Sequence, residues 1–393
     1  MNPRLQAFFI SSAALGFLLF LLLLLLNTAP KQSTTPRTLV VIPSQLASSA
    51  AGSEDAVLTT TASLPPSPPA ALTITKKSPE EPKKQPVALT TAPQATTTEV
   101  ERIQNPYATP PLTFDMVNVA TRQALVNILC MPKRGTLNPI SGSGVIIDPR
   151  GVILTNAHVA QYVLLSQGPD IDLTCTVRTG SPASPRWRAN ILYLPPVWVD
   201  QHVAEINKSQ PMSTGEHDYA LLSITGNADG SPISGQFPYL PVDIRNGIGF
   251  LNDAVLAAAY PAEFVGGISA QNSLYPVSSV TTIKQLLTFG PGTIDSFSVG
   301  GVIAAQGGSS GGAVTNAWDR LIGIISITSA GATTADRDLR AVTLSYIDQD
   351  FKAQTGKSLS QFLAVDPLSG ALDFARDTAP ALLSKYLQQL NKH

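Results

Sequence analysis

The feature that most constrains the fold is a series of short apolar runs, rich in β-branched residues, that begins near residue 124 and ends near residue 328. Glycine, proline, asparagine and aspartate separate the runs. Strands of this length and spacing are typical of antiparallel sandwiches and barrels, and about 230 residues suffice for two barrels. The expected strands are 124–130, 144–148, 152–155, 171–177, 188–194, 219–224, 254–260, 279–289, 301–305 and 321–328.

The chain before this region has a different character. Residues 7–26 contain no charged side chain, and as a helix they would span ~30 Å, the thickness of the hydrocarbon core of a bilayer. We expect an uncleaved membrane anchor at 7–26 with residues 1–6 on the cytoplasmic side. The alternative is a cleaved signal peptide, which usually has a shorter apolar stretch. Residues 27–111 are rich in proline, serine, threonine and alanine, so we expect a disordered linker.

The end of the chain has helical spacing. Apolar side chains recur at three- and four-residue intervals in 339–354, 358–364 and 380–390. We expect this extension to brace the second barrel, although a regulatory role is the alternative. The expected division is a β domain at 112–345, with barrels at about 122–240 and 241–345, and a helical extension at 346–393.

Charge and cysteine content limit the possible partners and the compartment. The formal net charge is -1, so no basic field indicates nucleic-acid binding. The two cysteines, Cys130 and Cys175, are either two buried thiols or one disulfide. Because an anchored, exported domain lies in an oxidising compartment, we expect the disulfide.

One glycine-rich stretch, AQGGSSGGAV at 304–313, contains the adjacent serines Ser309 and Ser310. A nucleophilic serine needs a base, a carboxylate that orients the base, and backbone amides that hold the oxyanion. Of the four histidines, His158 follows a strand, a glycine turn and a second strand. His202 and His217 lie in a polar stretch that indicates a surface loop or helix. His393 is the last residue of the sequence.

The blocks GSGVIID, GVILTNAHV, HDYALLSI and GGSSGGAV, in this order, resemble chymotrypsin-fold (trypsin-like) serine proteases, and most closely their bacterial HtrA-like (DegP-like) branch. The resemblance covers roughly 122–345. It implies an all-β core of two six-stranded antiparallel barrels. It also implies His158 as general base, Asp218 as its orienting carboxylate, Ser310 as nucleophile, and the amides of Gly308 and Ser310 as the oxyanion hole.

The same resemblance implies how the site differs from digestive enzymes. In those enzymes an aspartate precedes the nucleophile and pairs with a newly cut amino terminus, but here Ser309 stands in its place, so we expect no such activation. HtrA relatives usually carry a PDZ domain, and the residues after Tyr346 are too few for one. The residues expected to line the substrate pocket are uncharged, which favours a small or aliphatic side chain; they are Ala304, Gln306, Ser326 and Thr328.

These features predict a membrane-anchored, extracytoplasmic serine endopeptidase that acts on proteins or peptides without a cofactor. Glu216, His217 and Asp218 form a local cluster, but no second motif completes a metal site, so we expect no metal. Two alternatives remain: a non-catalytic peptide-binding module on the same fold, and a protease that is latent until a partner orders residues 290–309. The oligomeric state stays open.

Overall fold

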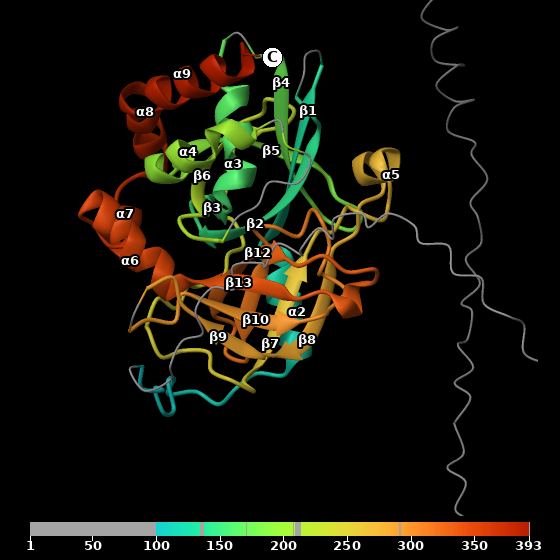
Figure 1. Ribbon diagram of the computed structural model, residues 1–393, viewed down its shortest axis with the longest axis vertical. Helices are drawn as coiled ribbons and strands as arrows, with labels where there is room; N and C mark the ends of the chain where they lie inside the picture. Colours follow the sequence, from blue (N-terminus) through green and yellow to red (C-terminus); the bar gives the residue numbers. More distant parts are fainter. Residues whose placement is uncertain are drawn as a thin grey trace, which may run out of the picture. The chain divides into compact units, whose positions relative to one another are not determined.

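The computed structural model describes residues 100–133, 137–169, 171–206, 208, 214–290 and 292–392. Within them, the first six strands form a closed antiparallel barrel in the order β1-β2-β3-β6-β5-β4 (Figure 1). These strands are β1 (Leu125–Pro132), β2 (Ile140–Asp148), β3 (Val152–Thr155), β4 (Leu173–Thr179), β5 (Ser184–Tyr193) and β6 (Ala220–Asn227). The first of the two predicted barrels is therefore confirmed.

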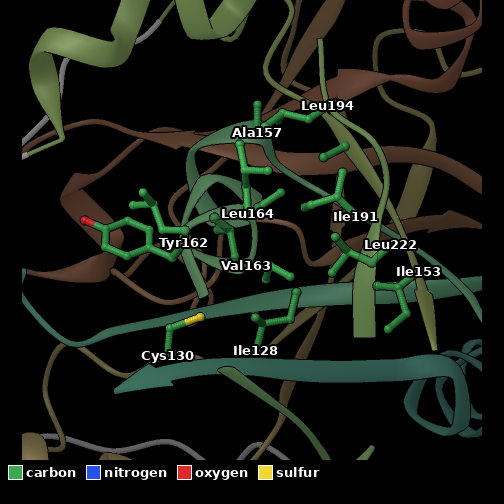
Figure 2. Close-up of a cluster of buried hydrophobic side chains, with 14 of the residues drawn as sticks. Ile128, Cys130, Ile153, Ala157, Tyr162, Val163, Leu164, Ile191, Leu194 and Leu222 are labelled. Carbon is green, nitrogen blue, oxygen red and sulfur yellow. The ribbon is translucent and has the colours of Figure 1, made fainter. Parts of the chain in front are cut away.

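The core of this barrel is apolar, and helix α3 (Ala157–Ser166) packs its buried side chains against it. Val163 and Leu164 of α3 are at most 2% exposed and share a buried cluster with Ile128 of β1 and Leu222 of β6 (Figure 2). Burying side chains of this kind stabilises the fold by roughly 1.5–3 kcal/mol each relative to leaving them in water. Helix α3 therefore has a fixed position on the barrel.

The predicted disulfide is also confirmed. Antiparallel pairing of β1 with β4 places Cys130 directly opposite Cys175, and the two sulfurs are bonded at 2.01 Å. The bond joins neighbouring strands across a sequence separation of 45 residues.

The second β unit differs from the predicted six-stranded barrel. It is a seven-stranded sheet in the order β8-β7-β11-β12-β13-β10-β9. Its strands are β7 (Ala254–Ala259), β8 (Val277–Thr282), β9 (Gln285–Leu287), β10 (Ser296–Gly300), β11 (Ala313–Asn316), β12 (Leu321–Thr328) and β13 (Leu339–Thr343).

The extra strand arises where the predicted strand 279–289 is interrupted. The amide of Ile283 still donates to Asp253 beside β7, at 3.0 Å, whereas the amide of Lys284 donates to Ser298 on β10, at 2.8 Å. The chain thus changes its pairing partner between β8 and β9, and these two strands form the opposite ends of an open half-barrel.

Two other local predictions are wrong. Residues 301–305 form turns instead of a strand, because Gly300 at φ +72° ends β10 and Gly301 lies against the Ala335 carbonyl, where a Cβ would be 2.3 Å from the oxygen. Residues 339–343, predicted as the start of a helix, form β13 because they pair with β10 and β12. The strands β10 and β11 were not among the strands expected from the sequence.

The helices outside the barrel core are short. They are α2 (Phe114–Ala124), α4 (Pro196–His202), α5 (Gly267–Asn272), α6 (Leu344–Thr355), α7 (Leu359–Leu363), α8 (Pro367–Asp377) and α9 (Ala379–Leu390), with the 3₁₀ turns η1 (Val203–Glu205) and η2 (Thr334–Asp336). None of the helices within the described ranges is long and apolar enough to cross a membrane. The predicted anchor at 7–26 lies outside these ranges.

The C-terminal extension was predicted to brace the second barrel. Its helices α8 and α9 instead pack on the first barrel. Phe374 of α8 and Leu382 and Tyr386 of α9 are buried in the same cluster as the apolar face of α3. Figure 1 shows both helices beside α3 and α4. The helical spacing predicted a helix at 380–390 but neither α8 nor the surface that the two helices cover.

The last residues of the predicted linker are also part of the fold. The Tyr107 hydroxyl donates to Asp243 Oδ2 at 2.6 Å and accepts from Asn316 at 2.8 Å, and its ring lies 5.0 Å from that of Trp318. Residues 100–111 therefore belong to the surface of the second sheet, because Tyr107, the one aromatic residue of the predicted linker, anchors them there.

We expect the variant Cys130→Ser to be less stable than the wild type by about 4 kcal/mol, because the disulfide closes a 45-residue loop and restricts the unfolded chain. Denaturant unfolding would measure the loss. A non-reducing gel should show a mobility shift on reduction for the wild type and none for Cys130→Ser. Equal unfolding midpoints for the two proteins would contradict the prediction.

Candidate active site

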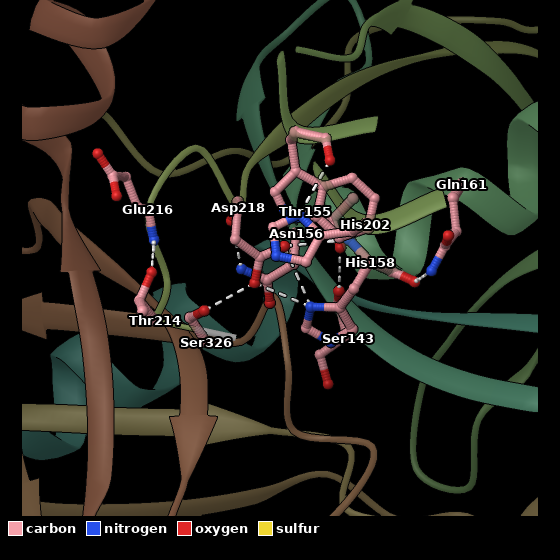
Figure 3. A network of polar contacts seen from close by, with 11 residues as sticks. Ser143, Thr155, Asn156, His158, Gln161, His202, Thr214, Glu216, Asp218 and Ser326 are labelled. Carbon is pink, nitrogen blue, oxygen red and sulfur yellow. Dashed lines mark hydrogen bonds and ion pairs between the residues drawn. The ribbon is translucent and has the colours of Figure 1, made fainter. Parts of the chain in front are cut away.

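The centre of the candidate site is an ion pair between His158 and Asp218. His158 Nδ1 lies 3.1 Å from Asp218 Oδ1 and 2.9 Å from Oδ2 (Figure 3). The Asp218 side chain is fully buried, whereas that of His158 is 24% exposed. His158 therefore turns Nδ1 to the carboxylate, while its other ring nitrogen, Nε2, has no hydrogen-bond partner among the described residues.

The start of helix α3 explains why the pair forms. The first amides of a helix lack partners within the helix and favour an anion. Asp218 fills this role, because the backbone amide of His158 donates to its Oδ1 at 3.0 Å. Asn156, at the N-cap, does not cap the helix with its side chain but donates to the Asp218 carbonyl at 2.8 Å. The turn TNAH thus supplies both the histidine and the bonds that hold its partner.

The second sheet supplies one more bond to the carboxylate. The Ser326 hydroxyl, on β12, donates to Asp218 Oδ2 at 2.8 Å. Burial by itself would raise the pKa of Asp218, but the His158 imidazole, the His158 amide and Ser326 together hold it below its usual range. Burial disfavours the charged form of His158, yet the nearby Asp218 outweighs this effect and raises the pKa of the imidazole.

The glycine-rich turn that contains Ser310 lies where both β units meet. Ser143 of β2 donates its amide to the Ser310 carbonyl at 2.7 Å and its hydroxyl to the Gly308 carbonyl at 2.9 Å. The same hydroxyl accepts the amide of Tyr260, next to β7, at 2.9 Å. From the other side, the Gly311 amide donates to Ile325, the neighbour of Ser326, at 2.7 Å. The turn is therefore held by both β units.

Close packing explains the glycine after Ser310. Gly311 has φ +84°, and a Cβ on it would lie 2.1 Å from the Ser143 carbonyl oxygen and 2.4 Å from Thr155 Oγ1. Thr155 stands three residues before His158 and donates to the same Ser143 carbonyl at 2.7 Å. Only glycine fits at this position, and its absent side chain lets the Ser310 turn approach the strand that leads to His158.

The turn contains polar groups without partners. Within the described part of the chain, the amides of Gly308 and Ser310 donate no hydrogen bond, and the half-buried Ser310 hydroxyl has none either. Ser309 is different, because its side chain is fully buried and its hydroxyl has no partner among the described residues. The amides of Gly308 and Ser310, two residues apart on one turn, can together bind an oxyanion, while Ser309 faces the interior.

An ion pair supports the segment just before this turn. Arg337 binds Glu263 with both terminal nitrogens, at 2.6 and 2.8 Å, and also donates to the Ala305 carbonyl at 3.0 Å. Glu263 Oε2 accepts the Gly307 amide at 2.8 Å, and the Gly307 carbonyl accepts the amide of Ala262 at 2.8 Å. Gly307, the residue before Gly308, is therefore held by both its amide and its carbonyl.

The predicted pocket residues have separate environments. Ala304 is fully buried, Gln306 is half-buried and donates to the Ile303 carbonyl at 2.7 Å, and Thr328 is half-buried. Ser326 directs its hydroxyl to Asp218, as described above. Two cavities of about 260 and 410 Å³ lie elsewhere, between β5 and the C-terminal helices, and hold neither His158 nor Ser310.

Several of these residues carried no recognisable signal in the sequence. Ser143 lies in the motif GSG, but its role depends on a carbonyl and an amide more than 100 residues away. Glu263 and Arg337 are distant in the sequence and meet only in the fold. Glu216, His217 and Asp218 do not converge, because His217 pairs with Asp350 and Asp218 with His158. No group of three or more potential metal ligands occurs among the described residues.

Comparison with known proteins agrees with this geometry. A search of curated proteins finds no match for the chain. Residues 142–324, however, match the family model of the trypsin-like peptidase domain, and this range includes His158, Asp218 and Ser310. The closed barrel and the half-barrel also agree with the fold of such peptidases. Residues 142–324 are therefore similar to trypsin-like peptidase domains.

Proposed function

We propose that this protein is a serine endopeptidase that cleaves peptide bonds through Ser310, His158 and Asp218. The observation that carries the proposal is the buried His158–Asp218 ion pair beside a turn whose Gly308 and Ser310 amides donate to nothing in the described structure. A peptide-binding module would need neither a paired imidazole nor open amides. We also propose, from the sequence resemblance, that the protein is most similar to the HtrA-like branch of these proteases.

In the proposed mechanism His158 Nε2 accepts the proton of the Ser310 hydroxyl as its oxygen attacks the scissile carbonyl. Asp218 keeps Nδ1 protonated and stabilises the imidazolium that forms. The amides of Gly308 and Ser310 hold the oxyanion, and His158 then gives its proton to the leaving amine as the C–N bond breaks. Water, deprotonated by the same imidazole, releases the acyl group from Ser310.

The proposed location is the outer side of a membrane, with residues 7–26 as the anchor. The length of this apolar run and the Cys130–Cys175 disulfide support an exported domain. A preference for small or aliphatic residues before the cleaved bond is part of the proposal, supported by the uncharged side chains of Ala304, Gln306 and Thr328.

A serine-directed phosphonate should label the full chain and the variant Ser309→Ala, but not Ser310→Ala. The reason is that only the Ser310 hydroxyl adjoins the open amides, whereas that of Ser309 is buried. Mass spectrometry of the labelled peptide measures the outcome. Absence of labelling in the wild type would favour the peptide-binding module, and labelling of Ser310→Ala would exclude Ser310 as the nucleophile.

The pH dependence of kcat/KM should show an acid limb centred above the ordinary histidine value of about 6.5. A general base must be neutral, and Asp218 raises the pKa of His158, so activity appears as the pH rises through this raised pKa. Asp218→Asn should move the limb to lower pH and reduce kcat by about 10⁴-fold. A limb at the same pH in both proteins would contradict the assignment of the pair.

The Glu263–Arg337 pair favours a turn that is already formed at rest over a latent enzyme. We expect Glu263→Gln to reduce kcat/KM on a peptide substrate by about 10-fold or more, because the Gly308 amide would lose part of its support. The matched control is Asp253→Asn, which breaks an ion pair with Arg102 on the second sheet. Equal activity of Glu263→Gln and wild type, or wild-type activity only after an activating peptide is added, would contradict a preformed turn.

A further inference from the structure

Asp350, on the C-terminal helix α6, contacts both neighbours of Asp218. Its Oδ1 lies 2.9 Å from Nδ1 of His217, the residue before Asp218. Its Oδ2 accepts the hydroxyl of Tyr219, the residue after Asp218, at 2.9 Å. One carboxylate, only 10% exposed, thus holds the chain on either side of the buried aspartate.

Helix α6 adds further bonds to the same cluster. The Tyr346 hydroxyl accepts the backbone amide of His217 at 3.1 Å. Gln354 donates to Asp350 Oδ2 at 2.6 Å and accepts the Tyr193 hydroxyl at 3.1 Å. The residues 346, 350 and 354 are spaced by one helical turn each, so they form one face of α6 toward this loop.

The backbone of the loop needs this support. His217 has φ +56°, a left-handed conformation that non-glycine residues seldom adopt and that persists only where the surroundings hold it. This conformation turns the chain so that Asp218 faces the start of α3 while its neighbours face α6. Release of His217 would let the loop relax and displace the Asp218 carboxylate.

We propose that Asp350 is a positioning residue for catalysis, which fixes Asp218 against His158 by binding His217 and Tyr219. The inference rests on the proposed function, since it takes Asp218 as the catalytic carboxylate. The start of the C-terminal extension thereby has a part in catalysis. Neither of its predicted roles, bracing a barrel or replacing a regulatory domain, includes this part.

The charges around His217 agree with this role. Asp350 on α6 and Glu216, whose carboxylate is 3.8 Å from Nε2, are the acidic groups that face the ring within the described residues, and Tyr346 faces its amide. The Asp350 carboxylate raises the pKa of His217 above its usual range. The His217 imidazolium that pairs with Asp350 is present below this raised pKa and is lost as the pH rises through it.

The test compares Asp350→Asn with the matched control Asp348→Asn in the full chain. Asp348 lies on the same helix, but it accepts the amide of Leu359 at the start of α7 and does not contact the Asp218 loop. The first measurement is the pKa of His158 by NMR in the Ser310→Ala background, which requires no turnover. The second is kcat and KM on a peptide substrate.

We expect Asp350→Asn to lower the pKa of His158 toward its ordinary value and to reduce kcat by about 10- to 100-fold with KM little changed. Asp348→Asn should change neither. If Asp350→Asn fails to fold, His217→Gln replaces it, with the same expected direction and a smaller effect.

The outcomes separate this inference from the proposed function. Identical His158 pKa values in Asp350→Asn and Asp348→Asn would overturn the positioning role, whatever the activity. A shifted His158 pKa in a protein that neither cleaves peptides nor reacts with the phosphonate would overturn the proposed function. It would leave Asp350 as the residue that orients the His158–Asp218 pair.

Discussion

The buried carboxylate of Asp218 is the constraint on which the rest of the site depends. A fully buried charge is tolerated only when it is paired and hydrogen-bonded, and here the partners come from two elements. His158 supplies its ring and its amide from α3, and Ser326 supplies its hydroxyl from β12. The need to satisfy one anion therefore draws the first barrel and the second sheet together at the point where Ser310 is presented.

Ser143, on the first barrel, also joins the two β units through its hydrogen bonds. It binds carbonyls on both sides of Ser309, and it accepts an amide that follows β7. Because these are backbone groups, the hydrogen bonds themselves use no side chain of the turn. The polar bonds across this junction rigidify the turn, while the ion pair of Glu263 with Arg337 fixes the segment that enters it.

The sequence allowed the residues of the candidate site to be proposed because their motifs are local. The segment that ends in TNAH carries its own helix start, HDYALL joins an aspartate to a buried strand, and GGSSGG makes a turn that few other residues permit. The closed first barrel followed from the short apolar runs, and the disulfide from its two cysteines. Each of these signals lies within a few residues or, for the cysteines, in a single possible pair.

What the sequence by itself determined was which segments carry the strands of the first barrel and which residues make up the candidate site. Only the tertiary structure decided that β8 and β9 take different partners, that α8 and α9 cover the first barrel, and that Asp350 meets His217 and Tyr219. The physical reason is that these contacts join residues far apart in the chain. A periodic pattern predicts which face of an element is buried, but the partner of that face is set by how the whole chain packs.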